Sequence, residues 1–197
     1  MKKIYLLLPL ILISCSQKEA NDVQIVIRND LAYEVNSDKP FTGLHITYHD
    51  NGQIKSKLTY NDGLQDLKED YFESGQLRKR ETFKNGEKTG FQLYYDSGQL
   101  GKDYIFKNGD LYEYETYYPD GMIEEKKFAE NDEIYTVESF YRDGQIEFRR
   151  RFKYNSNEKY SEHWYYPNGQ LEYFVIYSDG TNKIIEEEYT ESGERRY

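Results

Sequence analysis

The chain contains a single cysteine, Cys15, among its 197 residues. An intramolecular disulfide is therefore impossible, and the protein must fold without covalent cross-links. It has only three histidines, and it lacks the His-Glu-x-x-His sequence and the paired Cys-x-x-Cys sequences of zinc sites. Gly-x-Ser-x-Gly nucleophile elbows and the glycine patterns of nucleotide-binding loops are also absent. We therefore expect no metal, no cofactor and no enzymatic activity.

Basic residues are also fewer than acidic residues. Lys and Arg total 26 against 36 Asp and Glu, which gives a formal net charge of −10. Nucleic acids are bound through clustered lysines and arginines, so we expect no nucleic-acid partner. The two basic runs, Arg78–Arg80 and Arg149–Arg151, lie among acidic residues and are interpreted as solvated strand faces.

Aliphatic residues are scarce, but aromatic residues are not. The hydrophobic content is 37%, whereas aromatic residues reach 17% and tyrosines alone number 22. Acidic disordered chains are poor in aromatic residues, so this composition favours a folded protein. Tyrosine combines an apolar ring with a polar hydroxyl, which suits a thin, well-solvated sheet better than a thick core.

The N-terminus resembles the signal peptide of a bacterial lipoprotein. Two lysines precede an apolar run of ten residues, Ile4 to Ile13. That run matches the apolar region of a signal peptide and is too short for a membrane-spanning helix, which needs about 20 residues. Leu12-Ile13-Ser14-Cys15 resembles a lipobox, which implies that residues 1–14 are removed and that Cys15 carries a diacylglycerol. The alternative is an ordinary signal peptide with a chance cysteine.

The resemblance also implies a location. Residues 15–22 would form a short tether that holds the protein to the bacterial envelope by its lipid. Ser16, rather than aspartate, follows the cysteine, and in enteric lipoproteins this favours the outer over the inner membrane.

One sequence pattern recurs from residue 44 onward. A typical copy reads Tyr71-Phe-Glu-Ser-Gly-Gln-Leu77. The central glycines fall at positions 52, 75, 98, 121, 144, 169 and 193, so the spacing is 23 residues four times and then 25 and 24. Such a period defines a repeat architecture.

Each copy predicts one β-hairpin. A second glycine follows eleven residues after the first in several copies, in turn sequences such as Lys84-Asn85-Gly86. Two turns per repeat leave segments of about eight residues, which is strand length. Asn-Gly and Asp-Gly sequences close hairpins because they tolerate positive φ. We therefore predict an all-β fold, an elongated single-layer antiparallel meander of about six to seven hairpin repeats with about twelve to fourteen strands.

Some finer expectations follow from alternation along the strands. The apolar residue two after each glycine, as in Leu77, and the aromatic residue eight after it, as in Phe83, are predicted to share one face. Phe128 falls one place early in its copy, which indicates a register irregularity. Residues 23–43 are predicted to form a capping hairpin and loop, with Asn29-Asp30 at the turn, before the repeats of residues 44–197.

These units resemble those of a known family. The Tyr-Tyr-x-x-Gly-Gln-Leu units, the Phe-Lys-Asn-Gly segments and the entry Ser37-Asp38-Lys39-Pro40-Phe41-Thr42-Gly43 are similar to MORN-repeat variant proteins of the YwqK antitoxin family. The resemblance extends from about residue 22 to the end of the chain. It implies a non-catalytic protein that binds another protein, such as a toxin, an effector or an envelope component.

The candidate binding surface comes from paired aromatic residues before each glycine. Adjacent strand residues point to opposite faces, so the pairs predict an aromatic ladder on each side of the sheet. The ladders are explained either by cross-strand stacking that stabilises the sheet or by an exposed binding surface. The candidate residues are Phe72, Tyr95, Tyr118, Tyr141, Trp164 and Tyr166. The predicted function is that of an envelope lipoprotein with a protein-binding repeat module, for which the resemblance implies an antitoxin or immunity role. A structural scaffold and a glycan-binding surface are the alternatives.

Overall fold

The computed structural model describes residues 23–154 and 156–196, so the predicted signal peptide, Cys15 and the tether lie outside the described residues. Within these ranges the chain forms only strands, turns and loops. No helix in this part is long and apolar enough to span a bilayer. The strands are β1 (Ile25–Arg28), β2 (Leu31–Glu34), β3 (Gly43–Tyr48), β4 (Ile54–Asn61), β5 (Leu64–Tyr71), β6 (Leu77–Lys84), β7 (Glu87–Tyr94), β8 (Leu100–Lys107), β9 (Asp110–Tyr117), β10 (Ile123–Ala129), β11 (Ile134–Phe140), β12 (Ile146–Lys153), β13 (Lys159–Tyr165), β14 (Leu171–Tyr177), β15 (Lys183–Tyr189) and β16 (Arg195–Arg196).

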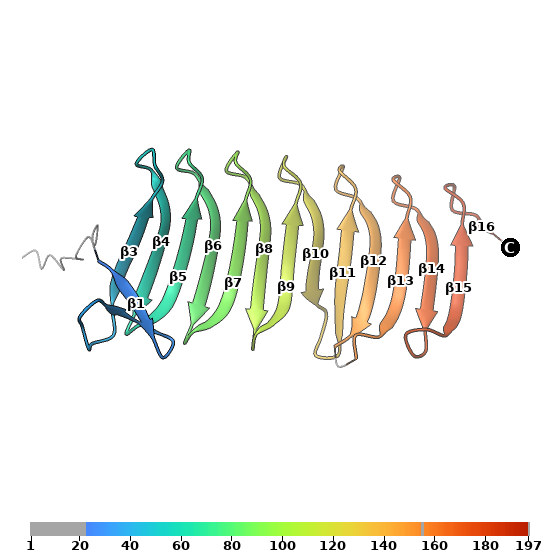
Figure 1. Ribbon diagram of the computed structural model, residues 1–197. Helices are drawn as coiled ribbons and strands as arrows, with labels where there is room; N and C mark the ends of the chain where they lie inside the picture. The colour runs from blue at the N-terminus through green and yellow to red at the C-terminus, as the bar shows by residue number, and fades with distance from the viewer. Residues whose placement is uncertain (1–22, 155, 197) are drawn as a thin grey trace, which may run out of the picture.

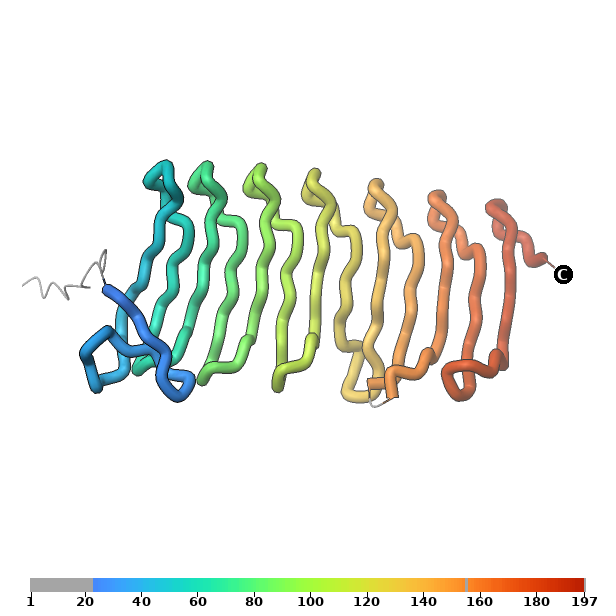
Figure 2. The backbone as a smooth tube through the Cα atoms, viewed as in Figure 1, coloured from blue at the N-terminus to red at the C-terminus, as the bar shows by residue number. Residues whose placement is uncertain are grey.

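Strands β3 to β16 form one open antiparallel sheet in sequence order, 14 strands wide, while β1 and β2 form a separate two-stranded sheet. Figure 1 shows the large sheet as a long row of hairpins in a single layer. The tube in Figure 2 shows the same turn recurring along the upper edge, whereas the connections along the lower edge differ in length. The predicted all-β hairpin array is confirmed.

The turns have the backbone conformations that the sequence indicates. At the turn between β5 and β6, Gly75 has φ +85° and donates its N–H to the carbonyl of Phe72 at 2.9 Å. At the opposite edge, Asn85 and Gly86 both have positive φ, +53° and +81°. Two successive positive φ values are typical of the two-residue turn that matches the twist of a hairpin.

A bulge in each repeat decides which side chains share a face. Strand pairing joins Tyr71 to Leu77 and Asp70 to Lys79, so Arg78 is an extra residue on β6. Because of this insertion, Leu77 lies on the same face as Tyr71, whereas Phe83 lies on the opposite face. The expectation that these two positions share a face is therefore wrong. We call the face that carries Tyr71 and Leu77 face A, and the face that carries Asp70 and Phe83 face B.

The sheet has little enclosed core. The buried hydrophobic residues among those described are Ala32, Tyr60, Tyr135, Val175 and Tyr177. Val175 is fully buried although the sheet is a single layer, and it lies on face B between Glu162 and Glu186 of the two neighbouring strands. Stability must therefore come from contacts between neighbouring strands, as in other repeat arrays.

The register irregularity or bulge predicted at Phe128 is not present, because β10 pairs with β11 without any register shift and lacks the second bulge of the other repeats. Phe128 stands one residue earlier in its copy than Phe83 does, and it lies on face A, paired with Thr136. On face B, the space that an aromatic residue such as Phe83 occupies in other repeats is filled by Tyr154. Its ring packs against the rings of Tyr112 and Tyr135 at centroid distances of 6.3 and 5.2 Å. Tyr154 belongs to the longer loop that accounts for the 25-residue spacing.

The entry hairpin forms at the predicted place, with Asn29 and Asp30 at its turn in positive φ. It does not pair with β3, which remains the outermost strand of the large sheet. Instead, it contacts the turn after β4: the Ala32 N–H donates to the carbonyl of Gly63 at 2.8 Å, and the Gly63 N–H donates to that of Phe41. In Figure 1, β1 crosses the lower ends of the first strands, over one face of the sheet.

Candidate binding surfaces

The second aromatic residue of each pair lies on face B and links neighbouring repeats. Its phenol donates to the backbone carbonyl of the first aromatic residue of the following repeat. These bonds are Tyr95 to Tyr117 (2.8 Å), Tyr118 to Phe140 (3.2 Å), Tyr141 to Tyr165 (2.8 Å) and Tyr166 to Tyr189 (3.0 Å). We call these four tyrosines the clamp tyrosines.

The clamp extends to the first repeat with a different residue. His49 Nε2 lies 3.0 Å from the carbonyl oxygen of Tyr71 and takes the place of a phenol. Phe72 occupies the same position in the second repeat but has no hydroxyl to donate. Four of the six predicted surface residues are thus clamp tyrosines, and all six are half-buried. Their contribution to binding stays a prediction, whereas their structural contacts account for the recurrence of the second aromatic.

Exchanging phenol and phenyl at two equivalent positions provides a test of the clamp. Phe72→Tyr is expected to stabilise the protein by about 1 kcal/mol because it adds a bond to the Tyr94 carbonyl, and Tyr118→Phe is expected to destabilise it by a similar amount. Urea denaturation followed by circular dichroism measures both changes. Equal shifts of the same sign in the two variants would contradict the clamp.

The first aromatic residue of each pair lies on face A in a continuous apolar row. In the strand pairing, each of these aromatic residues lies opposite the aliphatic residue that follows the next turn, as Tyr71 lies opposite Leu77. The row, which we call the apolar stripe, consists of Tyr48, Ile54, Tyr71, Leu77, Tyr94, Leu100, Tyr117, Ile123, Phe140, Ile146, Tyr165, Leu171 and Tyr189. Its members are half-buried, except for Tyr48, which is exposed. No second layer among the described residues covers this row.

Several phenols of the stripe are held by the residue two before them. Tyr71 donates to the Glu69 carboxylate at 2.9 Å, and Tyr94 donates to the side-chain oxygen of Gln92 at 2.9 Å. Burial, together with the hydrogen bond to Glu69, raises the pKa of Tyr71 to about 12. Tyr71 is therefore neutral at physiological pH, and the hydrogen bonds fix the orientation of both rings.

A row of charged residues runs beside the stripe on face A. Opposite charges face one another across neighbouring strands, as in Arg80 with Glu69 at 2.8 Å. Glu138, only 3% exposed, lies between Lys126 at 2.9 Å and Arg149 at 2.5 Å. Burial alone would raise the pKa of Glu138, but the hydrogen bonds and attraction of these two cations outweigh it and lower that pKa below 4.5. The basic runs are thus taken up in ion pairs.

Removing this buried carboxylate has a predictable pH signature. Because the pKa of folded Glu138 is lowered, its contribution to stability is present above the unfolded pKa of about 4.5 and is lost as the pH falls through the folded value. Glu138→Gln is expected to cost about 1–3 kcal/mol at pH 7 and less at pH 3. Urea unfolding at both pH values measures this. Glu87→Gln, at an exposed position on β7, is the control, and a pH-independent loss in Glu138→Gln would contradict the prediction.

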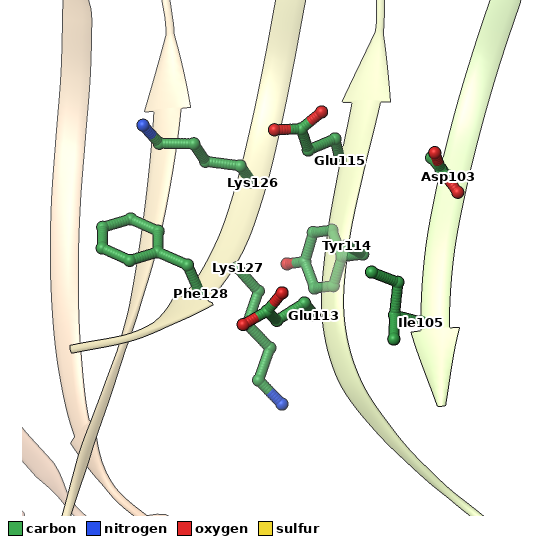
Figure 3. Close-up of a pocket in the computed structure, with 8 residues that line it drawn as sticks. All are labelled: Asp103, Ile105, Glu113, Tyr114, Glu115, Lys126, Lys127 and Phe128. Atoms are coloured by element: carbon green, nitrogen blue, oxygen red, sulfur yellow. The ribbon is translucent and has the colours of Figure 1, made fainter. Parts of the chain in front are cut away.

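Face A also contains a shallow hollow of about 400 Å³ across β8, β9 and β10. Figure 3 shows Asp103, Glu113 and Glu115 on one side and Lys126 and Phe128 on the other. Asp103 accepts a hydrogen bond from the Gln92 amide at 3.2 Å, and Lys126 pairs with Glu138, so these groups already have partners. In the described part of the chain, no group of three or more His, Cys, Asp or Glu residues is placed to hold a metal ion.

Three segments of the chain match the MORN repeat variant. They are residues 41–62, 67–85 and 162–179, each of which contains one of the recurring glycines. The first covers β3–β4, and the second and third cover most of β5–β6 and of β13–β14. The unit matched is therefore one hairpin of the array.

No curated protein matches the chain. Among solved structures, accessory secretory protein 1, 2 and 3 of Streptococcus pneumoniae has a similar segment with 16% identity and a TM-score of 0.33, covering 62% of this chain and 23% of the other. The GtfA/B complex bound to UDP and GlcNAc gives 13% identity and a TM-score of 0.24, and the match covers 68% of this chain and 24% of the other. The TcdB2-TccC3-Cdc42 complex gives 9% identity and a TM-score of 0.17, and the match covers 84% of this chain and 12% of the other. The chain thus spans less than a quarter of each of these structures.

Proposed function

We propose that this chain is a non-catalytic, repeat-based binding module that recognises another protein through face A. The apolar stripe is the observation that carries the proposal. It runs across the sheet from β3 to β15 with rows of paired charges beside it, and a long apolar surface with a charged rim is typical of protein interaction sites. The match to MORN repeat variants supports a binding module built from repeats.

We further infer that the protein is attached to the bacterial envelope and that its partner is of toxin or effector type. The lipobox-like sequence that ends at Cys15 favours attachment to the bacterial envelope by a lipid. The resemblance to the YwqK antitoxin family favours a partner of toxin or effector type, so that the protein would act as an immunity factor at the cell boundary. A scaffold that has no tight partner is the competing reading.

Site-specific photo-crosslinking in the native host tests the docking face. A photoreactive phenylalanine analogue at Ile105, which is 48% exposed on face A, is expected to capture a discrete partner protein. The same analogue at Lys102, exposed on face B of the same strand, is the matched control. Capture from Lys102 alone would overturn the assignment to face A. No discrete adduct from either position would overturn protein binding and favour the scaffold.

A further inference from the structure

Face B carries a short aromatic row near the C-terminal end that the repeat does not require. Strand pairing places Phe148 beside Trp164 and Trp164 beside Tyr173. The same row in the earlier strands is occupied mostly by polar residues, namely Thr47, Ser56, Asp70, Lys79, Leu93, Lys102, Thr116, Glu125 and Ser139. Because the fold forms equally with threonine, aspartate or lysine there, three consecutive aromatic residues need another explanation.

The three rings form a rigid platform. The Phe148 and Trp164 rings lie 5.2 Å apart, centroid to centroid, at an interplanar angle of 43°. The guanidinium of Arg150 lies over both rings, at 4.6 Å from Phe148 and 5.3 Å from Trp164, and it also pairs with the buried Glu162 at 3.0 Å. The Tyr173 phenol donates to Glu186 at 2.6 Å. The rings are therefore held in place before any ligand arrives, which reduces the entropic cost of binding.

A second hollow of about 400 Å³ opens at the end of this row. It is lined by Trp164, Tyr173, Glu172, Glu188 and Arg196. Glu188 is paired across the strands with both Tyr173 and Arg196, so a carboxylate and a guanidinium lie side by side next to the rings. Arg196 Nη2 lies 3.4 Å from the phenol oxygen of Tyr166, one of the clamp tyrosines.

The chemistry of this hollow selects a ligand class. The carboxylates of Glu172 and Glu188 only accept hydrogen bonds, whereas Arg196 only donates them. A ligand must therefore donate and accept at neighbouring positions, as adjacent hydroxyl groups do. Arg196 offsets one of the two carboxylates, and Arg150 is already paired with Glu162, so the hollow disfavours anionic ligands. The aromatic faces supply an apolar surface against which the C–H face of a sugar ring can pack.

We infer that the hollow between Trp164, Tyr173, Glu188 and Arg196 is a subsite for an uncharged sugar unit of a glycan. It lies on face B, opposite the proposed protein-docking surface, so that one protein would hold a protein on one face and a glycan on the other. The inference does not depend on the proposed function.

Trp164 is the only tryptophan in the chain, so its fluorescence reports directly on the subsite. The full-length protein in micelles of a sugar-free detergent is titrated separately with cellotriose, maltotriose and triacetylchitotriose. A saturable change in Trp164 emission is expected with at least one of them at concentrations up to about 10 mM, a typical range for a single shallow subsite. Arg196→Gln and Glu188→Gln are each expected to weaken that binding about tenfold, since each removes a charged hydrogen-bonding group. Lys102→Gln, in the same row but distant along the sheet, is expected to leave it unchanged.

Three results would overturn the inference. The first is an unchanged emission with all three sugars, which would leave the aromatic row as cross-strand packing alone. The second is a sugar response that persists at full affinity in both Arg196→Gln and Glu188→Gln while circular dichroism shows intact folding. The third is a response to a tetra-arginine peptide without any response to the sugars, which would make the platform a site for cationic protein segments.

Discussion

Replacing Gly63 by valine is expected to lower the free energy of unfolding by about 3 kcal/mol and to release the entry hairpin from the sheet. Gly63 has φ +79°, a conformation that β-branched residues adopt only with strain. A Cβ atom there would lie 3.0 Å from the Cβ of Leu31 and 3.1 Å from both the carbonyl oxygen of Ala32 and the Cβ of Pro40. The backbone oxygen cannot rotate away, so the hairpin must move and its hydrogen bonds to Gly63 are lost.

The Gly109→Val variant separates the backbone strain of a positive φ from the steric overlap with the entry hairpin. Gly109 has nearly the same φ, +83°, but no atom lies within 4 Å of the Cβ position. Gly109→Val is therefore expected to introduce backbone strain alone and to lower the free energy of unfolding by about 1–2 kcal/mol. Urea denaturation measures both losses, and limited proteolysis reports whether residues 35–42 become accessible in Gly63→Val only. Equal losses and equal cleavage in the two variants would contradict the docking role of Gly63.

Replacing Cys15 by alanine is expected to move the protein from the membrane fraction to the soluble fraction or to leave it mislocalised. The thiol is the atom that a diacylglycerol would be attached to, and the chain has no other cysteine. A single acyl chain gives marginal membrane binding, whereas two or more chains anchor a protein stably. The proposed anchor depends on this one thiol, so its replacement is expected to abolish membrane attachment almost completely.

Radiolabelled palmitate incorporation and fractionation of the native host measure this change. Ser16→Ala is the control, because it alters the neighbouring residue and keeps the thiol. It is expected to retain the label and the membrane association. Palmitate that still enters the Cys15→Ala protein would contradict lipid attachment at this residue.

Much of the array follows from local sequence. The recurring glycines at 75 and 86 require positive φ at turns whose neighbours have strand-forming residues, and the structure places a turn at each of them. The entry hairpin was equally predictable, since Asn29-Asp30 supplies two residues that tolerate positive φ. Turns depend on only a few consecutive residues, which is why these predictions succeed.

The candidate surface was only partly predictable. Alternation correctly indicated aromatic ladders on both faces, but it did not indicate that the phenols of Tyr95 and Tyr141 bond to the backbone of the next repeat. Residue type gave no clear signal, because the second position of the pair is tyrosine in four copies but is also occupied by His49 and Phe72. The bond partner lies more than twenty residues away, so local patterns do not reveal it.

The period, the hairpin unit, the all-β array and the absence of an intramolecular disulfide follow from the sequence alone. Which side chains share a face became clear only from the strand pairing, because the single extra residue at each bulge, such as Arg78, reverses the alternation that follows it. The tertiary structure also decided that the entry hairpin docks on Gly63 rather than along β3, and that Phe148, Trp164 and Tyr173 form one platform. Register and docking are set by pairing between segments distant in sequence, and this pairing depends on the whole sheet.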